Sequence, residues 1–94
     1  MKLIEYREIT AKMAGEDIKG WHPEKDRHQM KKIADLMAER GYGYVDRNFV
    51  TDGRVLWSVV ELRNSRRGHV FPGESEIVEK AFMNAFIEYN KFDR

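Results

Sequence analysis

The chain has 94 residues, 41% of them hydrophobic and 35% charged, and its 17 Lys and Arg against 16 Asp and Glu leave a net charge of +1. This length fits a single small domain over residues 1–94, and the near-neutral charge argues against a bulk binder of nucleic acid or membranes. The lack of cysteine excludes disulfides and thiolate metal sites, and no apolar run reaches the roughly 18 residues of a membrane span. We therefore expect a cytoplasmic protein without a signal peptide or a membrane partner.

The first 40 residues predict two helices separated by a loop over residues 16–22. In residues 1–14, three apolar side chains recur at helical spacing, and Gly15 is a suitable helix stop. They are Tyr6, Ile9 and Met13. The alternative for this segment is a short strand that begins at Leu3 and Ile4. We favour the helix.

The second helix has the clearer pattern. Pro23 suits the first helical position, because its missing N–H has no intrahelical partner there. Five apolar residues then follow at positions i, i+3, i+4, i+7 and i+8. They are Met30, Ile33, Ala34, Met37 and Ala38. Arg40 and then Gly41 end a predicted helix of about 17 residues.

Residues 42–63 predict a β-hairpin. Asp52-Gly53 is the preferred sequence of a two-residue type I′ turn, which pairs Thr51 with Arg54. In a regular ladder from this turn, one face carries Val45, Phe49, Leu56 and Val60. The other face carries Tyr42, Tyr44, Val50, Val55, Trp57 and Val59.

The remaining residues predict a short strand and a helix. His69–Phe71 adds a third strand that Pro72-Gly73 ends, and an apolar stripe from Ile77 to Tyr89 follows at helical spacing. The order helix, helix, strand, strand, short strand, helix predicts an α+β fold, an antiparallel sheet of two or three strands packed with helices. The expected core consists of Ile33, Met37, Val45, Phe49, Leu56, Val60, Phe82 and Phe86.

The sequence argues against catalysis and metal binding. There is no cysteine nucleophile, and no serine stands in a motif such as G-x-S-x-G. His22 and His28 are not at the i, i+4 spacing that places two imidazoles on one helix face, and Asp26 adds only weak support for a metal site. Gly41–Gly43 follows a helix, which is the wrong context for a phosphate-binding loop. We expect no enzyme activity, no metal and no cofactor.

A basic stretch makes nucleic acid the alternative partner. Residues 54–69 hold four arginines and one glutamate, and loop arginines can contact phosphates. The order helix, strand, strand, strand, helix resembles that of double-stranded-RNA-binding domains, which carry a lysine-rich phosphate clamp where the last helix begins. Here Gly73–Glu76 is acidic at that position, so the resemblance fails at the functional residues. This alternative would use Arg63, Arg66, Arg67, Lys31 and Lys32.

The aromatic face of the hairpin is the main candidate site, because large aromatics among scattered charges are typical of protein interfaces. Two other interpretations are cover by the first helix, giving an alpha-beta-alpha sandwich, and a homodimer contact. Together with the adjoining basic edge, the predicted partner surface consists of Tyr42, Tyr44, Trp57, Arg63, Arg66 and Arg67. We expect the separate Trp21 to fill the end of the core, with partner binding as its alternative role.

The order of short motifs along the chain resembles that of small phage proteins of the alpha-beta-alpha sandwich type. The corresponding stretches are Ile9–Gly15, Trp21–Pro23, Ile33–Tyr42, Trp57–Val59 and Glu76–Tyr89. The chain departs from that family in lacking Met-Gly-Trp at the end of the first helix. The resemblance implies a phage or prophage accessory protein of the bacterial cytoplasm, without catalytic residues. We therefore expect a non-enzymatic protein that binds a host or phage protein, with inhibition of that partner as the suggested action.

Overall fold

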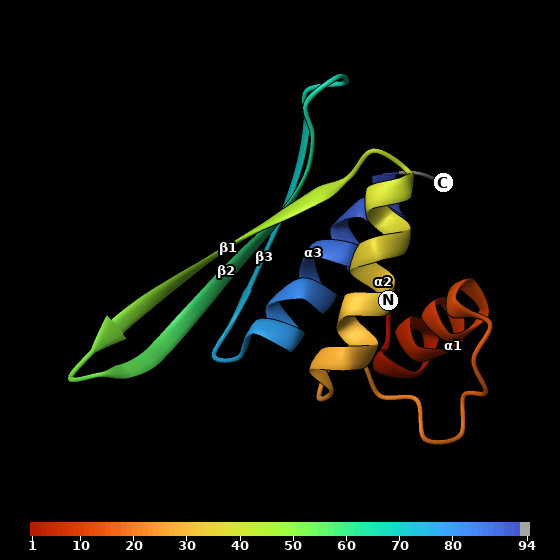
Figure 1. Cartoon of the computed structure of the whole chain (residues 1–94), viewed down its shortest axis with the longest axis horizontal. Helices are drawn as coiled ribbons and strands as arrows, with labels where there is room; N and C mark the ends of the chain where they lie inside the picture. The colour runs from red at the N-terminus through yellow and green to blue at the C-terminus, as the bar shows by residue number, and fades with distance from the viewer. Residues whose placement is uncertain (93–94) are drawn as a thin grey trace.

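A computed structural model describes residues 1–92, which form three helices and one three-stranded antiparallel sheet (Figure 1). The strands lie in the order β1-β2-β3, so β1 and β3 are the edges. The elements are α1 (Leu3–Ala14), α2 (Arg27–Glu39), β1 (Gly43–Thr51), β2 (Arg54–Asn64), β3 (His69–Ser75) and α3 (Val78–Phe92). The predicted α+β class and element order are confirmed.

The two N-terminal helices form as expected, but the second starts later than predicted. Gly15 ends α1 in the left-handed conformation, with φ 66°. At α2, the Asp26 carboxylate accepts a hydrogen bond from the backbone N–H of Gln29 at 3.1 Å and so caps the helix. Pro23 lies in the turn before this cap, and α2 has 13 residues instead of about 17.

Polar contacts hold the loop between α1 and α2. The Trp21 indole is 3% exposed and donates to Thr10 Oγ1 at 2.9 Å, which confirms that Trp21 fills the end of the core. Arg7 donates two hydrogen bonds to the buried carboxylate of Glu24. Burial alone would raise the pKa of Glu24, but the hydrogen bonds and charge of Arg7 hold it below its usual value. The buried hydroxyl of Tyr6 has no hydrogen-bond partner within residues 1–92.

The hairpin turn is confirmed, whereas the predicted register of the strands is wrong. Asp52 (φ 52°) and Gly53 (φ 73°) both adopt the positive φ of a type I′ turn, and Thr51 pairs with Arg54. Phe49, however, pairs with Trp57, so Leu56 is an extra residue in a β-bulge. From Trp57 to Arg63 every pairing is displaced by one residue. Each of these residues of β2 therefore pairs with a different residue of β1 from the one predicted.

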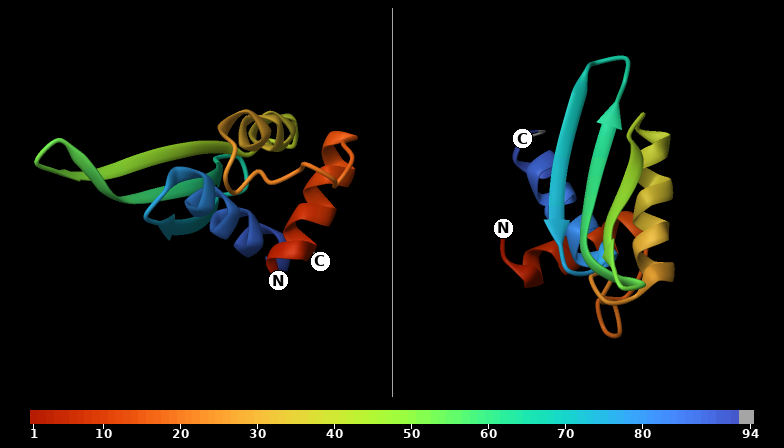
Figure 2. Two further views of the ribbon diagram at one scale, coloured as in Figure 1. Left: turned by 90° about the horizontal axis from the view of Figure 1, so that it is seen from below. Right: turned by 90° about the vertical axis from the view of Figure 1, so that its left-hand side faces the viewer.

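The bulge decides which side chains face the helices. Ser58, Val60, Leu62 and Asn64 are the buried residues of β2, and Tyr44 of β1 lies opposite Leu62. The helices α2 and α3 pack on this face of the sheet. Figure 2 shows α1 beyond them, away from the strands, where its Tyr6 ring meets Phe86 of α3 with the ring centroids 5.5 Å apart. In the part of the chain that the structure describes, no helix covers the other face.

The observed core contains five of the eight expected residues. Ile33, Met37, Val60, Phe82 and Phe86 are at most 1% exposed. The prediction is wrong for three others, which the shifted register and the length of the hairpin leave on the surface: Val45, Phe49 and Leu56.

The third strand also differs from the prediction, because β3 continues through Pro72-Gly73 to Ser75. Pro72 is tolerated since β3 is an edge strand. Gly73 is required by close packing: a Cβ there would overlap the backbone of Ala81 and Ala85 in α3.

Candidate functional site

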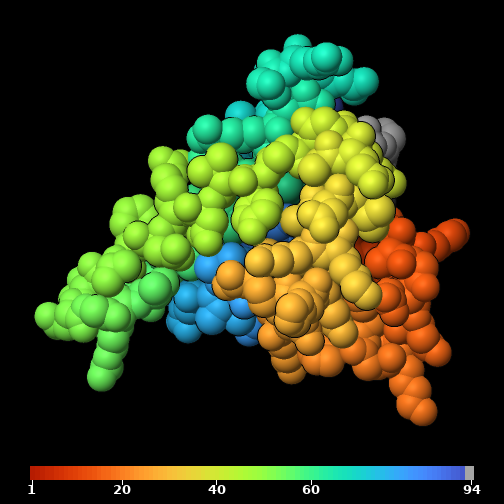
Figure 3. Space-filling model, viewed as in Figure 1, coloured from red at the N-terminus to blue at the C-terminus, as the bar shows by residue number. Residues whose placement is uncertain are grey.

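The most prominent feature of the surface is the far end of the β1–β2 hairpin. The strand β3 pairs with β2 only as far as Ser58, so residues 49–57 form a two-stranded ribbon, which we call the arm. The arm projects from the body of the molecule (Figures 1 and 3), and all of its residues are exposed. A two-stranded ribbon without a packed face gains little stability of its own.

The arm carries large apolar side chains on both of its faces. Five of its nine residues are large and hydrophobic, with exposures between 38% and 59%. They are Phe49, Val50, Val55, Leu56 and Trp57. Phe49 and Trp57 pair on one face and Val50 and Val55 pair on the other, so neither face is hidden from solvent. A hollow of about 410 Å³, lined by Val55, Asp46, Asn48 and the start of α3, adds a recess beside the arm.

The uncovered face of the sheet, which we call the open face, continues from the arm across the body. Its apolar residues besides Phe49 and Trp57 are Val45, Val59, Val70 and Pro72. Glu61 lies between these apolar residues. It accepts one hydrogen bond from Arg47 and a second, 3.0 Å long, from Arg63. Burial would raise the pKa of Glu61, but hydrogen bonds and charge from Arg63 and Arg47 outweigh it and lower the pKa. Apolar residues around paired charges match the composition of protein interfaces.

Two aromatics of the predicted partner surface belong to the core. The Tyr42 ring is 6% exposed and packs edge-on against Tyr89 with the centroids 5.0 Å apart, and its hydroxyl lies 3.1 Å from His69 Nδ1. Tyr44 is half-buried, with its ring 5.7 Å from that of Phe82. The prediction that Tyr42, Tyr44 and Trp57 share a face is therefore wrong, because the bulge places Trp57 on the open face, whereas the two tyrosines pack against the core.

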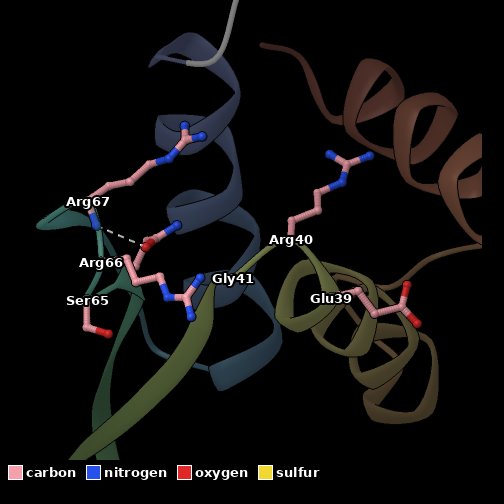
Figure 4. A pocket seen from close by; sticks show the side chains of 7 residues that line it. Glu39, Arg40, Gly41, Ser65, Arg66 and Arg67 are labelled. Atoms are coloured by element: carbon pink, nitrogen blue, oxygen red, sulfur yellow. Dashed lines mark hydrogen bonds between the residues drawn. The ribbon is translucent and has the colours of Figure 1, made fainter.

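The three predicted arginines are also divided between two places. Arg63 lies on the open face, whereas Arg66 and Arg67 lie in the turn between β2 and β3, at the opposite end of β2 from the arm. There they line a hollow of about 430 Å³ together with Arg40, which follows α2 (Figure 4). Sequence reasoning missed Arg40 as a site residue, because only tertiary packing brings it to a turn 26 positions later in the chain.

The structure offers little support for a metal or a nucleophile. Within residues 1–92, no group of three or more His, Asp or Glu side chains is placed to hold a metal ion, and this includes the neighbourhood of His22, Asp26 and His28. Ser58 is buried and donates its hydroxyl hydrogen bond to Asn48 Oδ1 at 2.7 Å. That contact ties β1 to β2 and does not activate the serine as a nucleophile.

Comparisons with family models, with curated proteins and with solved structures returned no match for the chain. The resemblance to small phage proteins thus stays a prediction. Among the described residues, no helix has the length and apolar character that crossing a bilayer requires.

Proposed function

We propose that this chain is a non-enzymatic binding protein that docks on another protein through the arm and the open face. The observation that carries this proposal is the arm, whose five large apolar residues project into solvent on both faces of a two-stranded ribbon. Exposed apolar surface of this kind marks interaction sites, because water contact with it is unfavourable until a partner covers it.

The two aromatic residues of the arm are suited to anchor a partner. Phe49 and Trp57 lie side by side on the open face, and aromatic anchors at the centre of an interface commonly contribute about 2 kcal/mol or more each. Around them the Arg47–Glu61–Arg63 group supplies hydrogen-bonding atoms at the rim. The outer edge of β1 is an unpaired strand edge, which can accept a strand of the partner by main-chain hydrogen bonds.

A protein partner fits this surface better than nucleic acid does. The open face combines arginines with Glu61, and the arm contains a single arginine, Arg54, beside Asp52. A phosphate backbone is bound by surfaces of one charge, whereas mixed charge around apolar anchors is the pattern of protein interfaces. If the chain is phage-encoded, it would inhibit a host protein when the arm occupies a groove that the host protein needs for its own activity.

Affinity capture from a lysate of the native host, with and without nuclease, tests this proposal. We expect one stoichiometric protein that resists nuclease and re-forms a binary complex after purification. Phe49→Ala and Trp57→Ala should each abolish its capture while the circular dichroism spectrum stays native. Arg66→Ala/Arg67→Ala, as the matched control on the other end of β2, should retain most capture at physiological salt.

Two outcomes would contradict the proposal. Nuclease-sensitive capture that the double arginine change removes would show that the chain binds nucleic acid through the β2–β3 turn and not a protein through the arm. Phe49→Ala protein that captures the partner as well as wild type would show that the arm takes no part in binding. If Trp57→Ala unfolds the domain, Phe49, which is 59% exposed, still decides the question.

A further inference from the structure

A second feature of the surface stands apart from the arm: the hollow between the end of α2 and the β2–β3 turn. Arg40, which follows α2, and Arg66 and Arg67, which lie in the turn, line this hollow, and their guanidinium groups point in different directions (Figure 4). An adjoining hollow of about 520 Å³ is lined by Arg40, Tyr42, Arg67 and Tyr89, so two of the three arginines border both spaces. Three arginines from two distant segments therefore line one recess.

The three arginines belong to the cations of the chain that have no carboxylate partner among the described residues. Six lysine and arginine side chains form ion pairs with carboxylates: Arg7, Arg27, Lys32, Arg47, Arg63 and Lys91. Within residues 1–92, Arg40, Arg66 and Arg67 have no such pair. Glu39 borders the hollow, but its carboxylate points away from the arginines (Figure 4). The positive charge in the recess is thus not balanced by the described part of the chain.

The backbone that carries the arginines is held in place. Asn64 is 7% exposed, and its Oδ1 accepts a hydrogen bond from the backbone N–H of Arg67 at 3.2 Å. Gly41 has φ 91°, and a Cβ there would lie 3.1 Å from Asn64 Nδ2, so the turn approaches the end of α2 closely. Arg40 donates from Nη1 to the Tyr89 hydroxyl at 3.2 Å, which orients its guanidinium. The recess is therefore formed before any ligand arrives.

We propose that this hollow binds a phosphate group, either of a small phosphorylated molecule or of a nucleic acid backbone. Guanidinium groups bind phosphate oxygens through paired, charge-assisted hydrogen bonds. A phosphate dianion also supplies the negative charge that no described carboxylate provides to these three arginines. A recess of about 430 Å³ has the size of a small-ligand site. The site is independent of the arm, so either proposal can fail without the other.

The test is a titration of isotope-labelled protein in chloride buffer with inorganic phosphate, pyrophosphate and a short single-stranded oligonucleotide, followed by NMR. We expect saturable shifts of the Gly41 and Arg67 backbone amides. Arg66→Gln/Arg67→Gln should weaken binding at least tenfold, since the change removes two positive charges and their charge-assisted hydrogen bonds to the phosphate. Arg54→Gln is the matched control, because Arg54 is exposed at the arm and has no carboxylate partner among the described residues.

The three probes separate the two sources of the phosphate. Saturation by pyrophosphate or phosphate that competes with the oligonucleotide assigns the site to a single phosphate group. Saturation by the oligonucleotide alone, with affinity that falls steeply as salt rises, assigns it to a nucleic acid backbone. The proposal is overturned if no probe gives saturable shifts at these amides, or if the double variant binds as tightly as wild type or as Arg54→Gln.

Discussion

Replacing Gly73 with alanine should force α3 away from the sheet. An alanine Cβ at this position would lie 2.7 Å from the carbonyl carbon of Asn84 and closer still to Ala85 N and Ala81 O. All three are backbone atoms of a helix, so no side chain can rotate to make room. Ordinary contact begins near 3.4 Å, and α3 would have to retreat by about 1 Å.

This displacement has a large expected cost, because α3 supplies the centre of the core. Phe82 and Phe86 are at most 1% exposed, and a gap of 0.5–1 Å removes about a quarter to a half of the dispersion energy of each contact across it. Overpacking of this kind typically costs about 1–3 kcal/mol, and we expect Gly73→Ala to lie at about 3 kcal/mol. For a domain of this length that corresponds to a fall in Tm of about 12–24 °C.

Thermal unfolding followed by circular dichroism measures this effect, and Gly43→Ala is its matched control. Gly43 is also a strand glycine, but a Cβ there meets nothing within 4 Å, so its substitution should leave Tm unchanged or slightly higher. A Gly73→Ala protein that melts within a degree or two of wild type would refute the close approach of β3 and α3. Equal losses in the two variants would assign the effect to the glycine backbone instead of the packing.

Three further predictions concern the turn and the buried polar groups. Gly53→Val should lower the free energy of unfolding in urea by about 1 kcal/mol or more, because φ is 73° there; an unchanged value would contradict the turn geometry. Tyr6→Phe should leave urea stability unchanged or raise it by up to about 1 kcal/mol, since the buried hydroxyl has no partner in residues 1–92, and a clear loss would reveal one. The lowered pKa of Glu24 stabilises the fold above the ordinary carboxyl pKa of about 4.3, and this contribution is lost as pH falls through the lower folded value. Glu24→Gln should therefore reduce the fall of the unfolding free energy at acid pH. An unaltered pH dependence would show that the Arg7–Glu24 pair does not cause that fall.

The elements that local patterns define were predictable from the sequence. The apolar stripes of α2 and α3 follow from side-chain spacing alone, and the Asp52-Gly53 turn follows from the positive φ that both central residues must adopt. In these cases the determining interactions lie within a few residues of each other, so the sequence contains the whole signal.

The faces of the hairpin were not predictable, because a single bulge residue decides them. Leu56 carries no sequence signature of a bulge, yet it moves Tyr44 to the core face and leaves Val45 and Phe49 in solvent. The hollow at Arg40 was missed for a related reason. Its three arginines are brought together by the packing of α2 against the sheet, and no local pattern records such a contact.

The central claim, that the arm is the binding element, is tested most directly by site-specific photo-crosslinking. A photoreactive phenylalanine analogue at Phe49 reports on the arm, and the same analogue at Ile4, which is 51% exposed on α1, is the control. We expect Phe49 to yield an adduct with one foreign protein, the protein that affinity capture recovers, and Ile4 to yield none. An absence of adducts at Phe49, equal adducts at both positions, or adducts only between two copies of this chain would contradict the account.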